Sequence, residues 1–142
     1  MRALFDLSML VALLDEQHVE NAKAHRWFAV NRAQGWASCP LTQNGFVRIL
    51  SQPSYAFPIP TGEAINHLLE ATESDDHVFW PGDISLLDEQ LIDHSRVLGP
   101  KQLTDIYLLA LAVKHGGRLV TFDRAIPMAA VRGARPEHLV VI

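Results

Sequence analysis

Residues 2–6, Arg2-Ala3-Leu4-Phe5-Asp6, form a short apolar run that ends in an aspartate, and residues 119–123, Leu119-Val120-Thr121-Phe122-Asp123, form a second run of this kind. Each run has the length and composition of a buried β-strand. In a parallel α/β sheet, ligands bind outside the carboxyl ends of the strands. The sequence therefore predicts that Asp6 and Asp123 lie at one ligand-binding edge of a sheet.

Short apolar segments alternate with helical patterns through the rest of the chain. We expect strands near residues 4–5, 35–38, 77–80, 118–122 and 138–142. We expect helices at 9–14, capped by Ser8, at 18–31, from a cap at Thr42 through 50, from 61, at 85–92 and at 104–115. This order predicts an α/β fold, a three-layer α/β/α sandwich around a central, mostly parallel sheet. The length of 142 residues predicts a single domain, residues 1–142.

Composition excludes several classes of protein. Hydrophobic residues make up 49% and charged residues 20% of the chain, a balance typical of globular proteins. No apolar run approaches the roughly 20 residues that cross a bilayer, and the first residues lack the long apolar segment of a signal peptide, so no membrane association is expected. Cys39 is the only cysteine, which rules out an intrachain disulfide and favours a cytoplasmic location.

The formal net charge of −4 argues against a protein that holds nucleic acid through bulk electrostatics. It argues less against a metal-dependent nuclease, because cations bound to aspartates would meet the phosphate directly.

A third aspartate, Asp105, follows Thr104 at the start of the clearest helical pattern. Leu109, Ala112 and Val113 lie on or near its helix face, so its carboxylate should point toward the rim of the core. Taken singly, each aspartate has an ordinary structural explanation as a cap, a helix-dipole partner or a turn residue. Three carboxylates gathered at one edge repel one another, and a hard divalent cation would relieve that repulsion.

Four segments resemble the signature blocks of PIN-domain ribonucleases, and most closely those of VapC-type toxins from bacterial toxin–antitoxin pairs. They are Phe5-Asp6-Leu7-Ser8, residues 39–50, residues 103–112 and residues 119–124. The resemblance implies a Mg²⁺- or Mn²⁺-dependent endoribonuclease with an RNA substrate, a cognate antitoxin protein as partner, and a homodimer. It further implies that Asp6 and Asp105 are the principal metal ligands and catalytic acids, that Asp123 completes the cluster, and that Ser8 lies near the metal.

The chain departs from the family pattern at one place. The family usually supplies a further glutamate from the helix after the second strand, where this chain has Gln43-Asn44-Gly45. Gln43 or Asn44 could offer a neutral oxygen ligand instead. This departure keeps open a catalytically weakened PIN-like domain that binds RNA or a partner. A separate alternative is a phosphohydrolase with Asp6 as an aspartyl nucleophile, although Ser8 stands where that class has a second aspartate.

Other side chains give weaker signals. No histidine has the spacing of a zinc ligand, and no serine lies in a Gly-x-Ser-x-Gly motif. Arg48, Arg118 and Arg124 could bind RNA phosphate. Tyr55 and Phe57 lie in the proline-rich segment 51–60, and we expect this loop or the helix after it to form part of a partner surface.

Overall fold

Five short strands form one parallel sheet in the computed structural model, which describes residues 1–142. The strands are β1 (Ala3–Phe5), β2 (Trp36–Ser38), β3 (His77–Phe79), β4 (Arg118–Thr121) and β5 (Leu139–Val141). Their spatial order is β3-β2-β1-β4-β5, so β1 lies at the centre with β4 beside it. Phe5 pairs with Val120, and the two strands end at the same level of the sheet. The two apolar runs are thus adjacent, as the sequence predicts.

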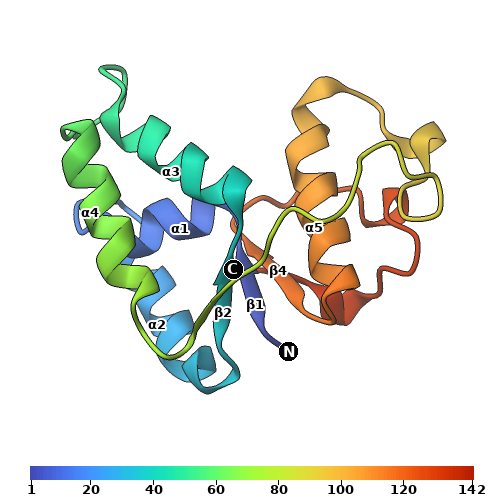
Figure 1. Ribbon diagram of the computed structural model, residues 1–142, viewed down its shortest axis with the longest axis horizontal. Coiled ribbons are helices and arrows are strands. Elements are labelled where there is room, and N and C mark those ends of the chain that lie inside the picture. The colour runs from blue at the N-terminus through green and yellow to red at the C-terminus, as the bar shows by residue number, and fades with distance from the viewer.

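Helices cover both faces of the sheet. Helices α1 (Leu7–Leu14), α2 (Asn21–Asn31), α3 (Pro40–Ser51) and α4 (Thr61–Thr72) gather on one side, and α5 (Leu103–Lys114) lies on the other (Figure 1). This arrangement confirms the predicted three-layer α/β/α fold. No helix is both long and apolar enough to cross a membrane.

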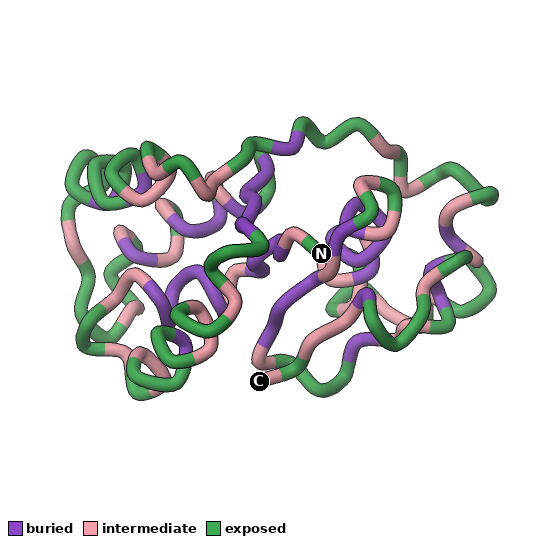
Figure 2. Tube along the Cα trace, turned by 90° about the horizontal axis from the view of Figure 1, so that it is seen from below, coloured by how far each residue is buried: buried purple, intermediate pink, exposed green.

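The alternation of side chains along the strands builds two separate cores. Phe5 and Val120 pack with Met9 and other residues of α1 on one face, while Leu4 and Leu119 pack against α5 on the other. Side chains of a strand point alternately to its two faces, so Asp6 continues the α5 side after Leu4. Figure 2 shows the buried positions concentrated along the strands and the inward sides of the helices.

Three helices begin earlier than the sequence predicts, α5 by a single residue, and α2 begins later, at Asn21 instead of residue 18. Helix α1 begins at Leu7, and its cap is Asp6, which accepts from the Met9 N–H, instead of Ser8. Helix α3 begins at Pro40, where proline is favoured because its missing N–H would have had no partner. Thr42 is therefore inside the first turn and accepts from the Cys39 N–H at 3.0 Å.

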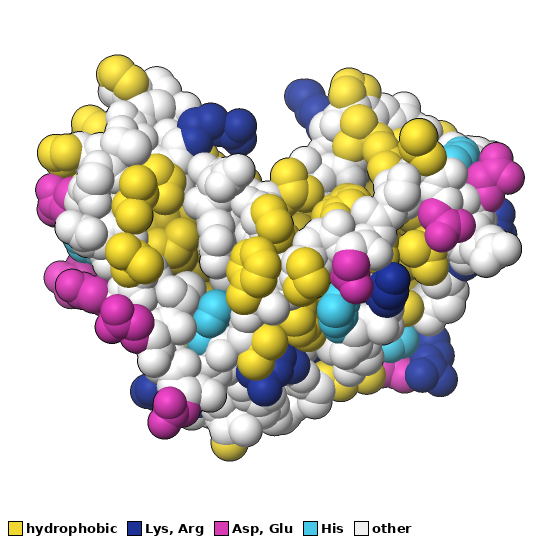
Figure 3. Space-filling model, viewed as in Figure 1, with side chains coloured by type: hydrophobic (Ala, Val, Ile, Leu, Met, Phe, Trp, Pro, Cys, Tyr) yellow, Lys and Arg dark blue, Asp and Glu magenta, His cyan; other side chains and the backbone are white.

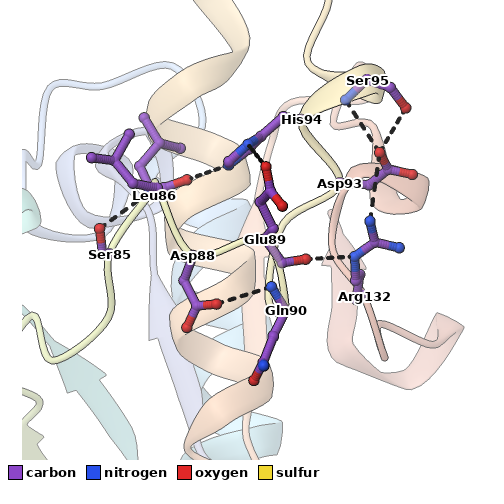
Figure 4. A network of polar contacts seen from close by, with 10 residues as sticks. Ser85, Leu86, Asp88, Glu89, Gln90, Asp93, His94, Ser95 and Arg132 are labelled. Atoms are coloured by element: carbon purple, nitrogen blue, oxygen red, sulfur yellow. Dashed lines mark hydrogen bonds and ion pairs between the residues drawn. The ribbon is translucent and has the colours of Figure 1, made fainter.

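The helix predicted for residues 85–92 is wrong, because this segment forms a series of turns (Figure 4). Ser85 accepts a hydrogen bond from the Leu87 N–H at 3.1 Å, and Asp88 accepts one from the Gln90 N–H at 2.9 Å. Such short polar side chains compete with helix formation by bonding the backbone two residues ahead. The Arg132 Nε also donates to a carbonyl oxygen of the segment at 2.7 Å, which ties the turns to the body of the protein.

The proline-rich loop contains one exposed and one half-buried aromatic residue. Phe57 is 51% exposed, whereas Tyr55 packs beside the α1 core and donates its hydroxyl to Asp15. The partner surface predicted for this loop stays a prediction, with Phe57 as its free aromatic.

Gly117 lies between α5 and β4, where the backbone of Arg2 and the ring of Trp80 leave no room for a side chain. A Cβ atom there would lie 2.6 Å from both the Arg2 carbonyl oxygen and a ring carbon of Trp80. We predict that Gly117→Ala lowers the free energy of unfolding by about 1–3 kcal/mol, as expected for overpacking. Urea denaturation followed by tryptophan fluorescence measures the change.

Gly62, in the first turn of α4, provides the matched control, because a Cβ there meets no atom within 4 Å. Gly62→Ala should raise the free energy of unfolding by roughly 0.4–1 kcal/mol, through a less flexible unfolded chain. Equal stability of Gly117→Ala and the wild type would contradict the close approach.

Candidate active site

Asp6 is a buried carboxylate at the carboxyl end of the central strand, with only 4% of its surface exposed. Its Oδ1 accepts hydrogen bonds from the Ser8 hydroxyl at 2.7 Å and from the Met9 N–H at 2.8 Å. Its Oδ2 accepts a hydrogen bond from the Thr121 hydroxyl. One side chain thus joins the end of β1, the start of α1 and the end of β4.

The environment of Asp6 opposes its ionisation. Burial raises the pKa of Asp6 above its ordinary value, and the negative charge of Asp123 acts in the same direction. The hydrogen bonds from Thr121, Met9 and Ser8 lower the pKa, because they stabilise the ionised carboxylate. Three hydrogen-bond donors hold the Asp6 carboxylate in a fixed position. Because its ionised form is still disfavoured, nearby positive charge would stabilise it.

Asp105 lies in the first turn of α5 and is half-buried. Burial, the negative charges of Asp6 and Asp123, and a hydrogen bond with Asp123 together raise the pKa of Asp105 to about 6. The three predicted carboxylates are therefore close enough to influence one another, although they come from distant parts of the chain.

Asp123 is the exposed member of the group. Its N–H donates to the Thr121 hydroxyl oxygen at 2.9 Å, and its Oδ1 accepts from the Ala125 N–H at 2.8 Å. The turn role suggested by its position is thus present alongside its electrostatic coupling to the other two acids.

Two hydroxyl groups hold the site together, and the sequence pointed to only one of them. Ser8 is not a helix cap, and its oxygen instead accepts from the Phe122 N–H at 3.1 Å while its hydroxyl donates to Asp6. Thr121 was missed. Its spacing of two from Leu119 places it on the α5 face of β4, which is the face that Asp6 shares, and strand alternation could have identified it.

The donor chemistry of the three acids fits a hard divalent cation, because carboxylate oxygens are the ligands that Mg²⁺ and Mn²⁺ prefer. Burial and neighbouring negative charge raise the pKa of Asp6 and of Asp105, so nearby positive charge would stabilise their ionised forms. As the side chains lie, no three His, Cys, Asp or Glu residues are placed so that they could hold one ion together. The ligand roles of Asp6, Asp105 and Asp123 therefore stay predictions.

The amides proposed to replace the missing glutamate lie on α3. Gln43 donates its amide N–H to the Ser38 hydroxyl oxygen at 3.0 Å, at the carboxyl end of β2, and Ser38 in turn contacts His77 Nε2 at 2.8 Å. Asn44 is exposed, and both amides line a hollow of about 220 Å³ between α3 and α4. Gln43 is thus anchored through its nitrogen, and a ligand role for its oxygen stays a prediction.

The three arginines proposed for RNA binding separate into different regions. Arg118 begins β4, at the edge opposite the acids, where it donates to Asn31 at 3.0 Å and lies 5.1 Å from the Trp27 ring. Arg48 and Arg124 are exposed. Figure 3 shows the surface hollowed between α3 and α5, with Lys or Arg side chains on both sides of the hollow. Arg118 is therefore structural, and an RNA contact remains open to the other two.

The geometry disfavours Asp6 as an aspartyl nucleophile. Attack on phosphorus requires a carboxylate oxygen that can reach the substrate, whereas both oxygens of Asp6 are engaged and the residue is buried. A small cation needs only a free lone pair, and the Oδ2 of Asp6, which accepts one hydrogen bond, keeps one.

No model of a known protein family matches the chain. Individual proteins do. The chain is 51% identical to Ribonuclease VapC44 of Mycobacterium tuberculosis over 142 residues, which cover all of both chains. It is 41% identical to Ribonuclease VapC39 of the same organism over 134 residues, 94% of this chain and 96% of the relative.

A solved structure shares the fold. The crystal structure of Mycobacterium tuberculosis VapC20, described as a sarcin–ricin loop cleaving toxin, superposes with a TM-score of 0.64. The match covers 94% of this chain and 99% of that one at 16% sequence identity. This superposition shows the shared fold, and the sequence matches over nearly the full length show that the chain belongs to the VapC-type family of PIN-domain ribonucleases.

Proposed function

We propose that this protein is a Mg²⁺- or Mn²⁺-dependent endoribonuclease that acts as the toxin of a toxin–antitoxin pair. The observation that carries the proposal is the coupling of Asp6, Asp105 and Asp123 at the carboxyl edge of the sheet. The names of the full-length relatives support ribonuclease activity.

A bound cation would supply Lewis-acid stabilisation of the phosphate and an activated water for hydrolysis of the phosphodiester bond. Asp6 and Asp105 would hold it, with Asp123 in support. The chain's own contribution is positioning: Ser8, Thr121 and the Met9 amide fix the orientation of the Asp6 carboxylate.

The partners proposed for the protein follow from its family. They are an RNA substrate, a cognate antitoxin and a second copy of the chain in a homodimer, within the cytoplasm. An antitoxin that places a cationic side chain over the three acids would neutralise their charge as a metal ion would.

A second candidate is a catalytically weakened domain that retains binding. The absence of a carboxylate at residues 43–45 favours it, because one negative charge fewer lowers the affinity for a cation. Cleavage assays separate the two candidates.

We predict that Asp6→Asn abolishes metal-dependent cleavage of a structured RNA. Asparagine retains the helix cap and nearly the same shape, so the variant should fold while losing the charge that holds a cation. Cleavage is measured by gel electrophoresis with Mg²⁺, with Mn²⁺ and with EDTA. Asp75→Asn, at an exposed residue with no part in the acid group, is the control and should cleave like the wild type.

Equal cleavage by the wild type and Asp6→Asn would identify a contaminating nuclease and contradict the proposal. Absence of cleavage by both, with RNA binding retained, would support the weakened domain instead.

Asp105 generates a prediction that does not depend on activity. Its folded pKa of about 6 exceeds the unfolded value, so its stabilising contribution is complete below about pH 4 and is lost as pH rises through 6. In EDTA at pH 7.5, Asp105→Asn should therefore be more stable than the wild type by about 1–2 kcal/mol, after allowance for solvent screening. The difference should shrink as pH falls toward 4, and urea denaturation at several pH values measures it.

Addition of Mg²⁺ should reverse the order of stability at pH 7.5, because the cation binds the folded wild type and not the variant. A wild type that stays less stable at saturating Mg²⁺ and Mn²⁺ would show that Asp105 holds no metal.

A further inference from the structure

A hollow of about 550 Å³ lies beside the acid group and has no role in the proposed chemistry. It is enclosed by α1, the start of α2, the end of α3 and the segment after β4. Its volume falls in the range of pockets that enclose small organic ligands, roughly 300–1,000 Å³.

The hollow is connected to the acids through Ser8 and Phe122, both of which line it. The Ser8 hydroxyl donates to Asp6 and accepts from the Phe122 N–H, and Phe122 directly precedes Asp123. The hollow is therefore one hydrogen bond away from Asp6 and one residue away from Asp123 along the chain, although none of the three acids lines it.

The lining combines an aromatic ring with cations. The half-buried Phe122 ring has the Lys23 ammonium 5.8 Å from its centroid, and Arg124 lies on the same rim. Lys23 and Arg124 are exposed, and neither forms an ion pair with a carboxylate. Glu20 is the one acid in the lining, so cations outnumber acids there.

Aliphatic side chains, including Val11, Ile49 and Ile142, form much of the remaining wall, together with Tyr55 and His18. A nucleotide matches this lining. Its flat base can pack on an aromatic ring between apolar walls, and its phosphate can contact cations. Proteins recognise single-stranded RNA in this way, by stacking unpaired bases on aromatic side chains beside positive charge.

We propose that this hollow, here called the base pocket, binds one unpaired nucleobase of the RNA next to the scissile phosphate. The base stacks on the face of Phe122 that Lys23 covers in the free protein, and Lys23 moves to the adjoining phosphate, which Arg124 also contacts. The proposal rests on the proposed ribonuclease function and adds to it a reason for cleavage in single-stranded segments.

The test measures binding apart from cleavage. A fluorescein-labelled, single-stranded RNA of ten nucleotides is titrated with protein in EDTA at low salt, and anisotropy gives the Kd. Phe122→Leu should raise the Kd by roughly 5- to 100-fold, the range expected for loss of base stacking, while Phe122→Trp should retain affinity. Lys23→Gln should reduce the slope of log affinity against log salt by about 0.7, the value for one phosphate contact on a single strand.

Phe79→Leu is the matched control, because Phe79 is an exposed aromatic on β3, at the edge of the sheet, outside the base pocket. It should bind RNA like the wild type. Thermal unfolding of each variant checks folding, and Lys23→Gln keeps the test decisive if Phe122→Leu is destabilised, because Lys23 is exposed.

Unchanged affinity in both Phe122→Leu and Lys23→Gln, or absence of RNA binding by the wild type, would overturn the base pocket. The ribonuclease proposal would still stand if metal-dependent cleavage were lost in Asp6→Asn. Retained RNA affinity with loss of binding to the antitoxin would assign the hollow to a polypeptide and would likewise overturn the proposal.

Discussion

The buried carboxylate of Asp6 is the interaction on which the rest of the structure depends. Asp6 follows the central strand and caps the first helix, and it accepts a hydrogen bond from the Thr121 hydroxyl of the neighbouring strand. Burying a charge is costly unless it is paired or hydrogen-bonded, and here three donors meet part of that cost. The donors do not offset the burial completely, so the pKa of Asp6 stays above its ordinary value. The same hydrogen-bond donors therefore fix the position of Asp6 in the fold and orient its carboxylate toward the place where a cation would bind.

Most of the fold could be predicted from apolar runs and their spacing. Short buried strands such as residues 3–5 and 118–121 carry a continuous apolar signal, and their parallel order follows from the helices between them. The segment 85–92 was mispredicted because its apolar residues mimic a helical face, while Ser85 and Asp88 bond the backbone locally. Helix starts were also misplaced, since the choice between Asp6 and Ser8 as cap depends on which oxygen reaches the Met9 amide.

The candidate site was predicted in part. The strand ends and a helix start predict Asp6, Asp105 and Asp123, and in the structure the charges of these carboxylates influence one another. Their role as ligands stays a prediction. Thr121 escaped notice because a threonine in a strand is common and only its partner reveals its role. Arg118 lies at the edge of the sheet opposite the acids, where it contacts Asn31 and Trp27, a position that its residue type alone does not reveal. The hydrogen bond from the Gln43 amide to Ser38 could not be predicted, because no sequence pattern indicates which polar side chains meet across β2 and α3.

The central claim is that the three coupled carboxylates form one metal site. Anomalous diffraction from crystals of the protein soaked in Mn²⁺ tests it most directly. The account predicts one or two anomalous peaks within coordinating distance of the Asp6 and Asp105 carboxylates, near Asp123, and their loss in crystals of Asp105→Asn. An ordered Asp6 and Asp105 with no peak between them at saturating Mn²⁺ would contradict the account.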